Sequence, residues 1–202
     1  MAKLESKTVS VGKLFSQDYF FRIPEYQRPF SWDADNVRDL IGDLLAASRE
    51  SDYFLGTLVM HSTSTNSYDI VDGQQRLTAL CILFACIRDL HSVRTERDLH
   101  AEIQDKILQP KKLLDGVDAR PRLTVRDQSI FNAMVIADGG TETYFPSGKT
   151  SPVEARYLEA AKIFRTQLAD LDAAEVGAFV GFVSQKCVVI FLAATDFEDA
   201  FK

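Results

Sequence analysis

The chain has 202 residues, of which 46% are hydrophobic and 26% are charged, a composition typical of a globular protein that can bury a core. The formal net charge of -6 at pH 7 excludes a protein that coats nucleic acid by bulk electrostatics, because phosphate neutralisation needs an excess of Lys and Arg. The most apolar stretch, residues 77–87, is too short to cross a bilayer about 30 Å thick, and no secretory signal pattern precedes it. The sequence therefore predicts a cytoplasmic protein with no membrane partner.

The first half of the sequence mixes short helices and strands. Hydrophobic spacing and turn residues predict the following elements: a helix over 10–15, a strand over 19–23, a helix over 33–48, strands over 53–61 and 68–71, and a helix that starts after residue 73. The two neighbouring strands are expected to form a hairpin. Apolar residues occupy most faces of the last helix, so we expect it to be buried as the central core helix.

The second half of the sequence is mainly helical. Its predicted elements are helices over 96–108, 127–136, 152–171 and 173–185, strands over 122–125 and 187–192, and a flexible loop over 139–152. The strand that begins at Cys187 is continuously apolar, as expected for a strand buried on both faces. The apolar spacing of residues 197–201 breaks off without a helix stop signal, so we expect an excised boundary at residue 202.

These elements predict an α+β fold with two regions. Residues 1–93 are expected to form a small mixed sheet with the buried helix. Residues 94–202 are expected to form a mainly helical region, with one buried strand over 187–194, that packs on the first region.

The sharpest motif is Asp72-Gly73-Gln74-Gln75-Arg76, where a predicted strand gives way to a helix. The N-terminus of a helix has unpaired backbone N–H groups and a partial positive charge, which suit an anion. Gly73 permits a tight turn, Arg76 adds a guanidinium matched to phosphate oxygens, and Asp72 could hold Mg²⁺ or accept a proton from water. The alternative is that Asp72 is only a helix N-cap and Arg76 a surface residue.

A second group of polar and aromatic residues lies in the proline-stiffened loop over 22–32. Arg22, Arg28 and Gln27 stand among aromatic side chains that include Tyr26 and Trp32, a mixture that suits stacking on a base while gripping phosphates. The alternative is a hydrophobic plug in which the aromatic side chains cover the core and the arginines pair with acids.

Basic residues are also concentrated between residues 106 and 126. Lys111, Lys112, Arg120 and Arg122 are the candidates for contacts with DNA on an otherwise acidic chain. A solvated surface is the more common outcome for such a stretch and remains the alternative.

Together, the two motifs resemble a known family. The pattern Ile-Pro-x-Tyr-Gln-Arg-x-Phe-x-Trp over 23–32, followed by Asp-Gly-Gln-Gln-Arg-Leu-Thr over 72–78, is similar to the N-terminal domain of GmrSD-type restriction endonucleases. The resemblance implies a fold like the ParB and sulfiredoxin nucleotide-binding fold. It also implies a nucleoside-triphosphate-binding and hydrolysing sensor in a bacterial phage-defence factor that restricts modified DNA.

The resemblance also implies roles for individual residues. The hydrolysis motif would comprise Asp72, Gln74, Gln75 and Arg76, with Asp72 directed to Mg²⁺. The nucleotide would be held by Arg22, Tyr26, Gln27, Arg28, Gly73 and Thr78. The implied partners are a nucleoside triphosphate, modified phage DNA and a nuclease domain or subunit not present in this chain, while self-association into a homo-oligomer stays open. Two rival functions also remain: a non-enzymatic reader of modified DNA, and a domain that nicks DNA itself.

Overall fold

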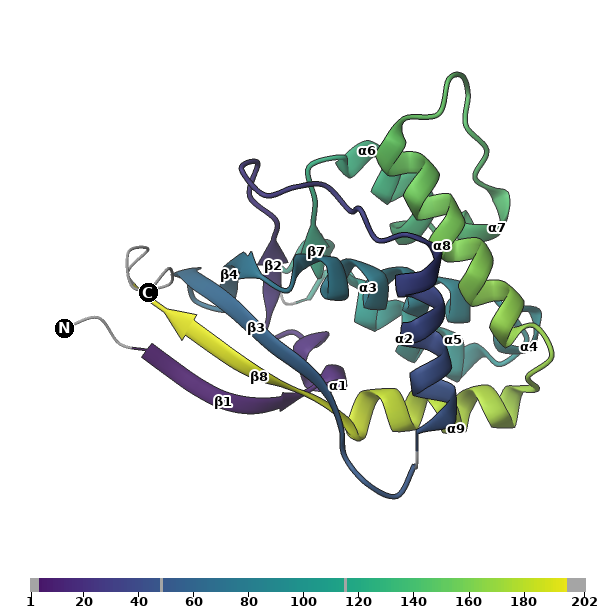
Figure 1. Cartoon of the computed structure of the whole chain (residues 1–202), viewed down its shortest axis with the longest axis horizontal. Helices are drawn as coiled ribbons and strands as arrows, with labels where there is room; N and C mark the ends of the chain where they lie inside the picture. The colour runs from purple at the N-terminus through teal and green to yellow at the C-terminus, as the bar shows by residue number, and fades with distance from the viewer. Residues whose placement is uncertain (1–3, 48, 115, 196–202) are drawn as a thin grey trace.

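Strands and helices occupy different sides of the molecule, with the sheet at the left and the helices at the right of Figure 1. The computed structural model describes residues 4–47, 49–114 and 116–195. The strands are β1 Leu4–Ser10, β2 Phe20–Arg22, β3 Tyr53–Ser64, β4 Ser67–Asp72, β5 Leu108–Gln109, β6 Arg120–Pro121, β7 Leu123–Thr124 and β8 Cys187–Ala194. The helices are α1 Val11–Leu14, α2 Ala34–Ala46, α3 Gln74–Asp89, α4 His91–Arg94, α5 Arg97–Ile107, α6 Gln128–Phe131, the π-helix η1 Asn132–Ile136, α7 Gly140–Thr143, α8 Pro152–Leu168 and α9 Ala173–Gln185. The predicted α+β class is confirmed.

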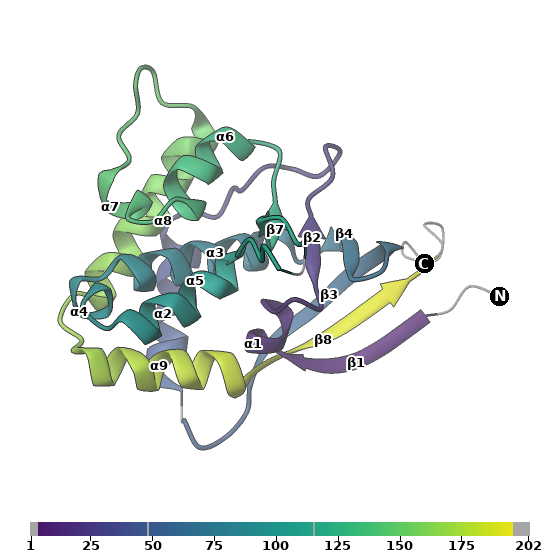
Figure 2. The same ribbon diagram turned by 180° about the vertical axis from the view of Figure 1, so that it is seen from behind.

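The main sheet is mixed and has the strand order β1-β8-β3-β4-β2-β7. β3 and β4 form the predicted antiparallel hairpin. β8 lies between β1, to which it is antiparallel, and β3, to which it is parallel (Figure 2). One sheet therefore takes strands from both of the regions that the sequence predicts.

The environment of β8 differs from the prediction. Cys187, Val189 and Phe191 are buried, but Ile190 on the opposite face is 38% exposed. The expectation of burial on both faces was wrong, because the helices cover this strand on one face only. A continuously apolar strand is thus compatible with one open face.

α3 is the central helix, as predicted. Every residue from Leu77 to Asp89 is buried. α3 packs against α5 and α8. Burial of apolar surface stabilises the folded state by roughly 25 cal/mol per Å² removed from water. The helix that follows the Asp72–Arg76 motif is therefore held rigidly by the core.

Capping residues fix where three other helices begin. α2, α8 and α9 each start with a capping box, formed by Asp33 with Asn36, by Ser151 with Glu154, and by Asp172 with Glu175. In each box the side chain of the first residue accepts a hydrogen bond from a backbone N–H that would otherwise lack a partner. The predicted starts of these helices are confirmed for this reason.

A buried ion pair closes the C-terminal end of α3. Arg88 and Asp89 have fully buried side chains, and Arg88 Nε lies 2.7 Å from Asp89 Oδ1. The guanidinium donates to the carbonyl oxygens of Val135, Ile136 and Ala137. Asp89 accepts from the N–H of Gly139 and of Thr141, each at 2.9 Å, and from the Thr141 hydroxyl. This pair anchors the chain from η1 into α7.

The segment over 139–152 is not wholly a loop. Its first part forms the short helix α7, Gly140–Thr143, because Asp89 accepts the two backbone N–H groups at its start. The prediction of an unbroken flexible loop was wrong at this end. The acid that orders the turn lies some fifty residues away in the sequence, so local composition did not indicate it.

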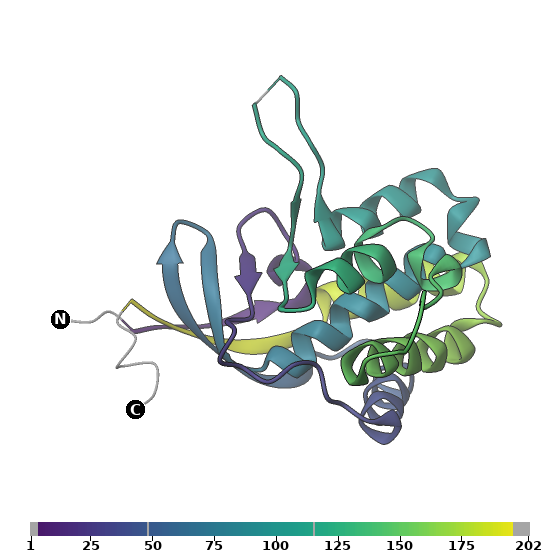
Figure 3. The same cartoon turned by 90° about the horizontal axis from the view of Figure 1, so that it is seen from above.

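A narrow two-stranded arm, residues 108–121, projects from the body of the molecule (Figure 3). Near its tip Leu113 and Leu114 are 80% and 103% exposed. Lys111 and Asp118 face each other across the arm at 3.3 Å. The arm therefore presents both basic and apolar side chains to solvent.

Within the part of the chain that the structure describes, none of the helices combines the length and apolar character needed to cross a membrane. The predicted excised boundary at residue 202 falls in 196–202, outside the described residues.

Candidate functional site

The turn between β4 and α3 has an open helix start. Gly73 is the N-cap residue, has a φ of +94°, and supplies no side-chain cap. Asp72 is exposed and does not cap α3, so the alternative in which Asp72 is merely an N-cap is wrong. Among the described residues, no side chain caps the start of α3, which leaves the positive end of the helix open to an anion.

Arg76 lies one turn into α3 and crosses onto β3. Its Nη1 is 3.4 Å from the carbonyl oxygen of Thr57, and a Cβ added at Gly56 would lie 3.0 Å from its Nη2. Gly56 has a φ of +104° and interrupts the pairing register of β3 with β8. A glycine in β3 therefore makes room for the guanidinium.

Burial lowers the pKa of Arg76, and the charge of Asp72 partly offsets that effect. An arginine still keeps its proton at neutral pH, since its ordinary pKa is above 12. The turn thus combines a permanent positive charge with an exposed carboxylate.

The two glutamines of the motif hold the loop over 24–32 against α3. Gln75 Oε1 accepts the N–H of Ser31 at 2.7 Å, and Gln75 Nε2 donates to the carbonyl oxygen of Pro29 at 3.0 Å. Gln74 Nε2 donates to Gln27 Oε1 at 3.1 Å, and Gln27 Nε2 donates to the carbonyl oxygen of Val71 at 2.8 Å. We call these contacts the glutamine clamp. They bring the two sequence motifs together.

We expect the variant Gln75→Met to loosen the loop without unfolding the protein. Methionine fills a similar volume but can neither accept from Ser31 nor donate to Pro29. Losing a hydrogen bond worth about 1–1.5 kcal/mol corresponds to roughly tenfold faster hydrogen exchange at the Ser31 amide. Gln74→Met is the matched control, because Gln74 is equally buried but bonds to the Gln27 side chain. Unchanged protection of Ser31 in Gln75→Met would contradict the clamp.

Thr78 lies one helical turn after the first residue of α3. Its side chain is buried, and its hydroxyl donates to the carbonyl oxygen of Gln74 at 2.8 Å. The hydroxyl proton is thus engaged one helical turn back, and the contact of Thr78 with a nucleotide stays a prediction.

Arg22 is paired with an acid that the sequence motifs did not indicate. Its Nε and Nη2 donate to the two carboxylate oxygens of Asp69, at 2.7 and 2.5 Å. Because β2 and β4 are parallel neighbours, Arg22 and Asp69 stand opposite each other in the register. Asp69 holds the pKa of the Arg22 guanidinium above its ordinary value. Tyr26, 58% exposed, lies at the same end of the loop.

Residues 11–202 match the family described as the GmrSD restriction endonuclease, N-terminal domain. The chain belongs to this family. Its membership places it among restriction-endonuclease-associated defence proteins, which act on DNA. A comparison with curated proteins found no match.

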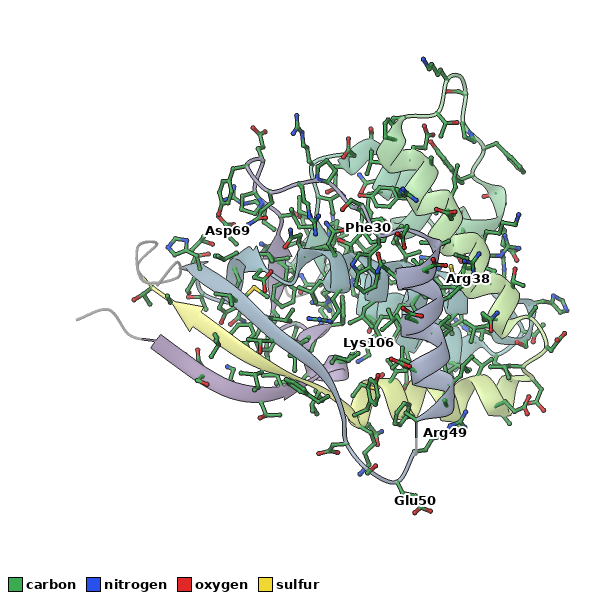
Figure 4. The ribbon with its side chains drawn as sticks, in the orientation of Figure 1. Phe30, Arg38, Arg49, Glu50, Asp69 and Lys106 are labelled. Atoms are coloured by element: carbon green, nitrogen blue, oxygen red, sulfur yellow. The ribbon has the colours of Figure 1, made fainter. Side chains whose placement is uncertain are left out.

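In this GmrSD N-terminal domain, the aromatic residues of the loop divide their roles. Phe30 is buried and stacks on Tyr157 of α8 with ring centroids 5.6 Å apart, and Trp32 packs against the core. Tyr26 is exposed. In Figure 4, Phe30 lies toward α8, whereas Asp69, the partner of Arg22, lies well apart at the sheet. The plug interpretation therefore holds for Phe30 and Trp32 but not for Tyr26.

Arg28 of the GmrSD domain points to a different neighbourhood from Arg22. It lines a hollow with Arg126 and Arg156, two arginines that the sequence motifs did not single out. They come from the segment before α6 and from α8, so only the folded chain brings them beside the motif.

The basic residues proposed for DNA contact are only partly on the surface. Lys111, Lys112 and Arg120 are exposed, and Arg120 lies over the Phe20 ring at 4.0 Å. Arg122 is 4% exposed, its Nε donates to the carbonyl oxygen of Asp105, and its guanidinium also faces Phe20. Arg122 is therefore corrected from a DNA contact to a buried arginine that lies between β6 and β7 and joins this segment to α5.

The described residues of the GmrSD domain contain no cluster of three or more His, Cys, Asp or Glu side chains placed to hold a metal ion. Cys81, Cys86 and Cys187 are buried free thiols, and burial raises the pKa of the Cys81 thiol to about 12. Asp72 remains the carboxylate nearest to the open start of α3 in sequence.

Proposed function

We propose that this domain binds a nucleoside triphosphate at the Asp72–Arg76 turn and hydrolyses it to regulate a nuclease that restricts modified DNA. The observation that carries the proposal is the open start of α3 beside the half-buried Arg76 and the exposed Asp72. Unpaired N–H groups, a helix dipole and a guanidinium are the groups that bind phosphate in many unrelated proteins.

The residues of the turn divide the work in this proposal. The N–H groups of α3 and Arg76 neutralise phosphate charge as it develops. Asp72 orients the attacking water or accepts its proton. Gly73 lets this turn form, because its φ of +94° and the Leu58 side chain packed against it leave no room for a Cβ.

Mg²⁺ is compatible with this turn as a partner of the nucleotide. Mg²⁺ in such sites is held by one or two carboxylates together with substrate phosphates, so the exposed Asp72 could hold it without a preformed cluster. The ion would supply charge neutralisation at the phosphate oxygens.

The glutamines are proposed to position the loop over the site. Both polar atoms of the Gln75 amide are engaged with backbone of the loop, and Gln74 is engaged with Gln27. We assign to the clamp the task of keeping Gln27 and Tyr26 over the phosphates. Arg22 is proposed to lie on the same side of the site as Gln27 and Tyr26, with its positive charge partly neutralised by Asp69.

Arg76→Ala and Asp72→Ala are expected to reduce nucleotide turnover by roughly a hundredfold or more, as expected when a preorganised charge is removed from a reacting centre. Phosphate release is measured with Mg²⁺ and each nucleoside triphosphate, with and without modified DNA. Asp39→Ala and Arg97→Gln, which remove exposed charges on α2 and α5, serve as controls. Wild-type turnover in both turn variants, with unchanged melting temperatures, would show the proposal to be wrong.

The competing function is a non-enzymatic reader of modified DNA. The 58% exposure of Tyr26 favours it, because an exposed ring beside an arginine can stack on a base. Lys111, Lys112 and Arg120 on the arm are the proposed backbone contacts. A reader predicts that Tyr26→Ala weakens DNA binding while nucleoside triphosphates leave the melting temperature unchanged. A nucleotide-dependent rise in melting temperature would instead favour the nucleotide-binding function.

A further inference from the structure

A hollow of about 550 Å³ lies between the loop over 24–32, the segment that precedes α6, and the start of α8. Its volume falls within the range of roughly 300–1,000 Å³ that is usual for small-molecule sites. Pro29, Phe30 and Val153 supply apolar parts of its wall. Phe30 marks its position in Figure 4, between the loop and α8.

Three arginines line this hollow: Arg28, Arg126 and Arg156. Among the described residues, no acid forms an ion pair with Arg28 or Arg126, whereas Arg156 Nη1 lies 2.9 Å from Glu159. Asp127 is the acid found among the lining residues. The wall of the hollow therefore carries an excess of positive charge on a chain whose overall net charge is -6.

Gathering three positive charges beside fewer acids costs free energy, and an anion in the hollow would lower that cost. The start of α8 does not supply this binding by itself. The N–H groups of Ser151 and Glu154 are used within the capping box, and the residue between Ser151 and Val153 is a proline, which has no N–H. The arginines are the positively charged groups of the lining that can bind such an anion. Planar guanidinium groups match the oxygens of a phosphate, to which each can donate two hydrogen bonds.

We infer that this hollow is a second phosphate site of the domain, separate from the Asp72–Arg76 turn, and that its ligand is a nucleotide phosphate. The arginines hold the phosphate, and the apolar wall formed by Pro29 and Val153 accommodates the sugar or base. The nucleotide belongs either to a DNA strand or to a free mononucleotide, which share this chemistry. The assignment of the ligand as a nucleotide, among compounds that carry a phosphate, rests on the proposed function. The positive charge of the hollow is independent of that function.

The glutamine clamp connects the two sites. Gln75 at the start of α3 holds Pro29 and Ser31. Both residues line the hollow, and Pro29 directly follows Arg28 in the chain. A ligand that moves Arg28 toward the hollow would therefore displace the same loop segment that Gln75 holds.

The test uses the whole chain and the variants Arg126→Gln and Arg156→Gln. Binding is measured by fluorescence anisotropy with two probes, a labelled DNA duplex and fluorescent analogues of ATP and GTP. We expect each variant to weaken binding of one probe by about tenfold. Where that probe is DNA, the slope of the logarithm of the binding constant against the logarithm of the salt concentration should fall by about one phosphate contact. Arg97→Gln, an exposed arginine on α5 without an ion-pair partner in the described chain, is the matched control and should bind as the wild type does.

Asp127→Asn tests the sign of the effect. It removes the lining carboxylate, so it should strengthen binding, opposite to the arginine variants. Weaker binding of DNA alone assigns the hollow to a strand phosphate, and weaker binding of the nucleotide analogue alone assigns it to a free nucleotide. Binding of both probes that is unchanged in Arg126→Gln and Arg156→Gln, with wild-type melting temperatures, overturns the inference.

Asp72→Ala, measured in parallel, separates this inference from the proposed function. Loss of turnover in Asp72→Ala together with wild-type binding in both arginine variants would uphold the turn as the hydrolysis site and overturn the second site. Normal turnover in Asp72→Ala together with weakened DNA binding in the arginine variants would do the reverse.

Discussion

Replacing Asp89 with alanine is expected to lower the free energy of unfolding by about 3–5 kcal/mol. The change would leave the fully buried Arg88 guanidinium without its buried counter-charge, with the exposed Asp138 at 3.8 Å from its Nε, and the N–H groups of Gly139 and Thr141 without their acceptor. An unpaired buried charge costs far more than the ion pair contributes when intact. Urea denaturation followed by circular dichroism measures the loss.

Two comparisons identify the cause. Asp118→Ala removes one partner of an exposed ion pair on the arm and should change the stability little, because solvent screens that pair. The double variant Arg88→Met with Asp89→Leu removes both buried charges, and should be more stable than Asp89→Ala alone. An Asp89→Ala protein with the wild-type urea midpoint would contradict the assigned role.

The same pair predicts how stability depends on pH. Burial raises the pKa of Asp89, but the hydrogen bonds and charge of Arg88, with those of Thr141, outweigh it, so the pKa lies below its ordinary value of 3.8. Because the folded-state pKa is depressed, this contribution to stability is complete above about pH 4 and is lost as the pH falls through the folded-state value. Asp89→Asn should therefore flatten the acid limb of the stability profile relative to the wild type.

Gly73→Ala is expected to destabilise the protein by about 2–4 kcal/mol and to disturb the turn itself. Gly73 has a φ of +94°, which L-residues with a side chain rarely adopt, and an added Cβ would overlap the Cδ2 atom of the buried Leu58. Backbone strain and overpacking each cost roughly 1–3 kcal/mol. Urea denaturation measures the stability, and a nucleotide-dependent thermal shift measures the function of the turn.

Gly116→Ala is the matched control for that prediction. Gly116 also has a positive φ, of +64°, but a Cβ at this position would have no neighbour within 4 Å. Gly116→Ala should lower the free energy of unfolding only by the cost of the left-handed backbone conformation, about 1 kcal/mol. Equal losses of stability in Gly73→Ala and Gly116→Ala would mean that the contact with Leu58 is not responsible for the requirement for glycine at residue 73.

Elements with strong local signals could be predicted from the sequence. The apolar residues that cover most faces of α3, and the turn residues between β3 and β4, express local physics. β1 was missed because its residues, Leu4–Ser10, are largely polar, and only pairing with β8 at the other end of the chain orders it. Contacts between distant segments have no local sequence signature.

The same limit applied to the site. The motif spacing indicated that Asp72, Gly73 and Arg76 share one turn, because they are neighbours along the chain. The partner of Arg22 and the role of Arg126 depend on which strands and loops lie side by side, and the spacing did not contain that information. The burial of Arg122 under Phe20 was hidden for the same reason, since a run of basic residues alone does not say which of them face solvent.

The glutamine clamp has a thermodynamic consequence. One side chain, Gln75, fixes the loop backbone at Pro29 and Ser31 from the first turn of α3, so the loop cannot shift without changing the end of that helix. If ligands occupy both the turn and the hollow, the factor by which the first raises the affinity for the second must equal the factor by which the second raises the affinity for the first. A short loop tied to a rigid helix would in this way place the ligand of the hollow and the ligand of the turn in a single reciprocal equilibrium.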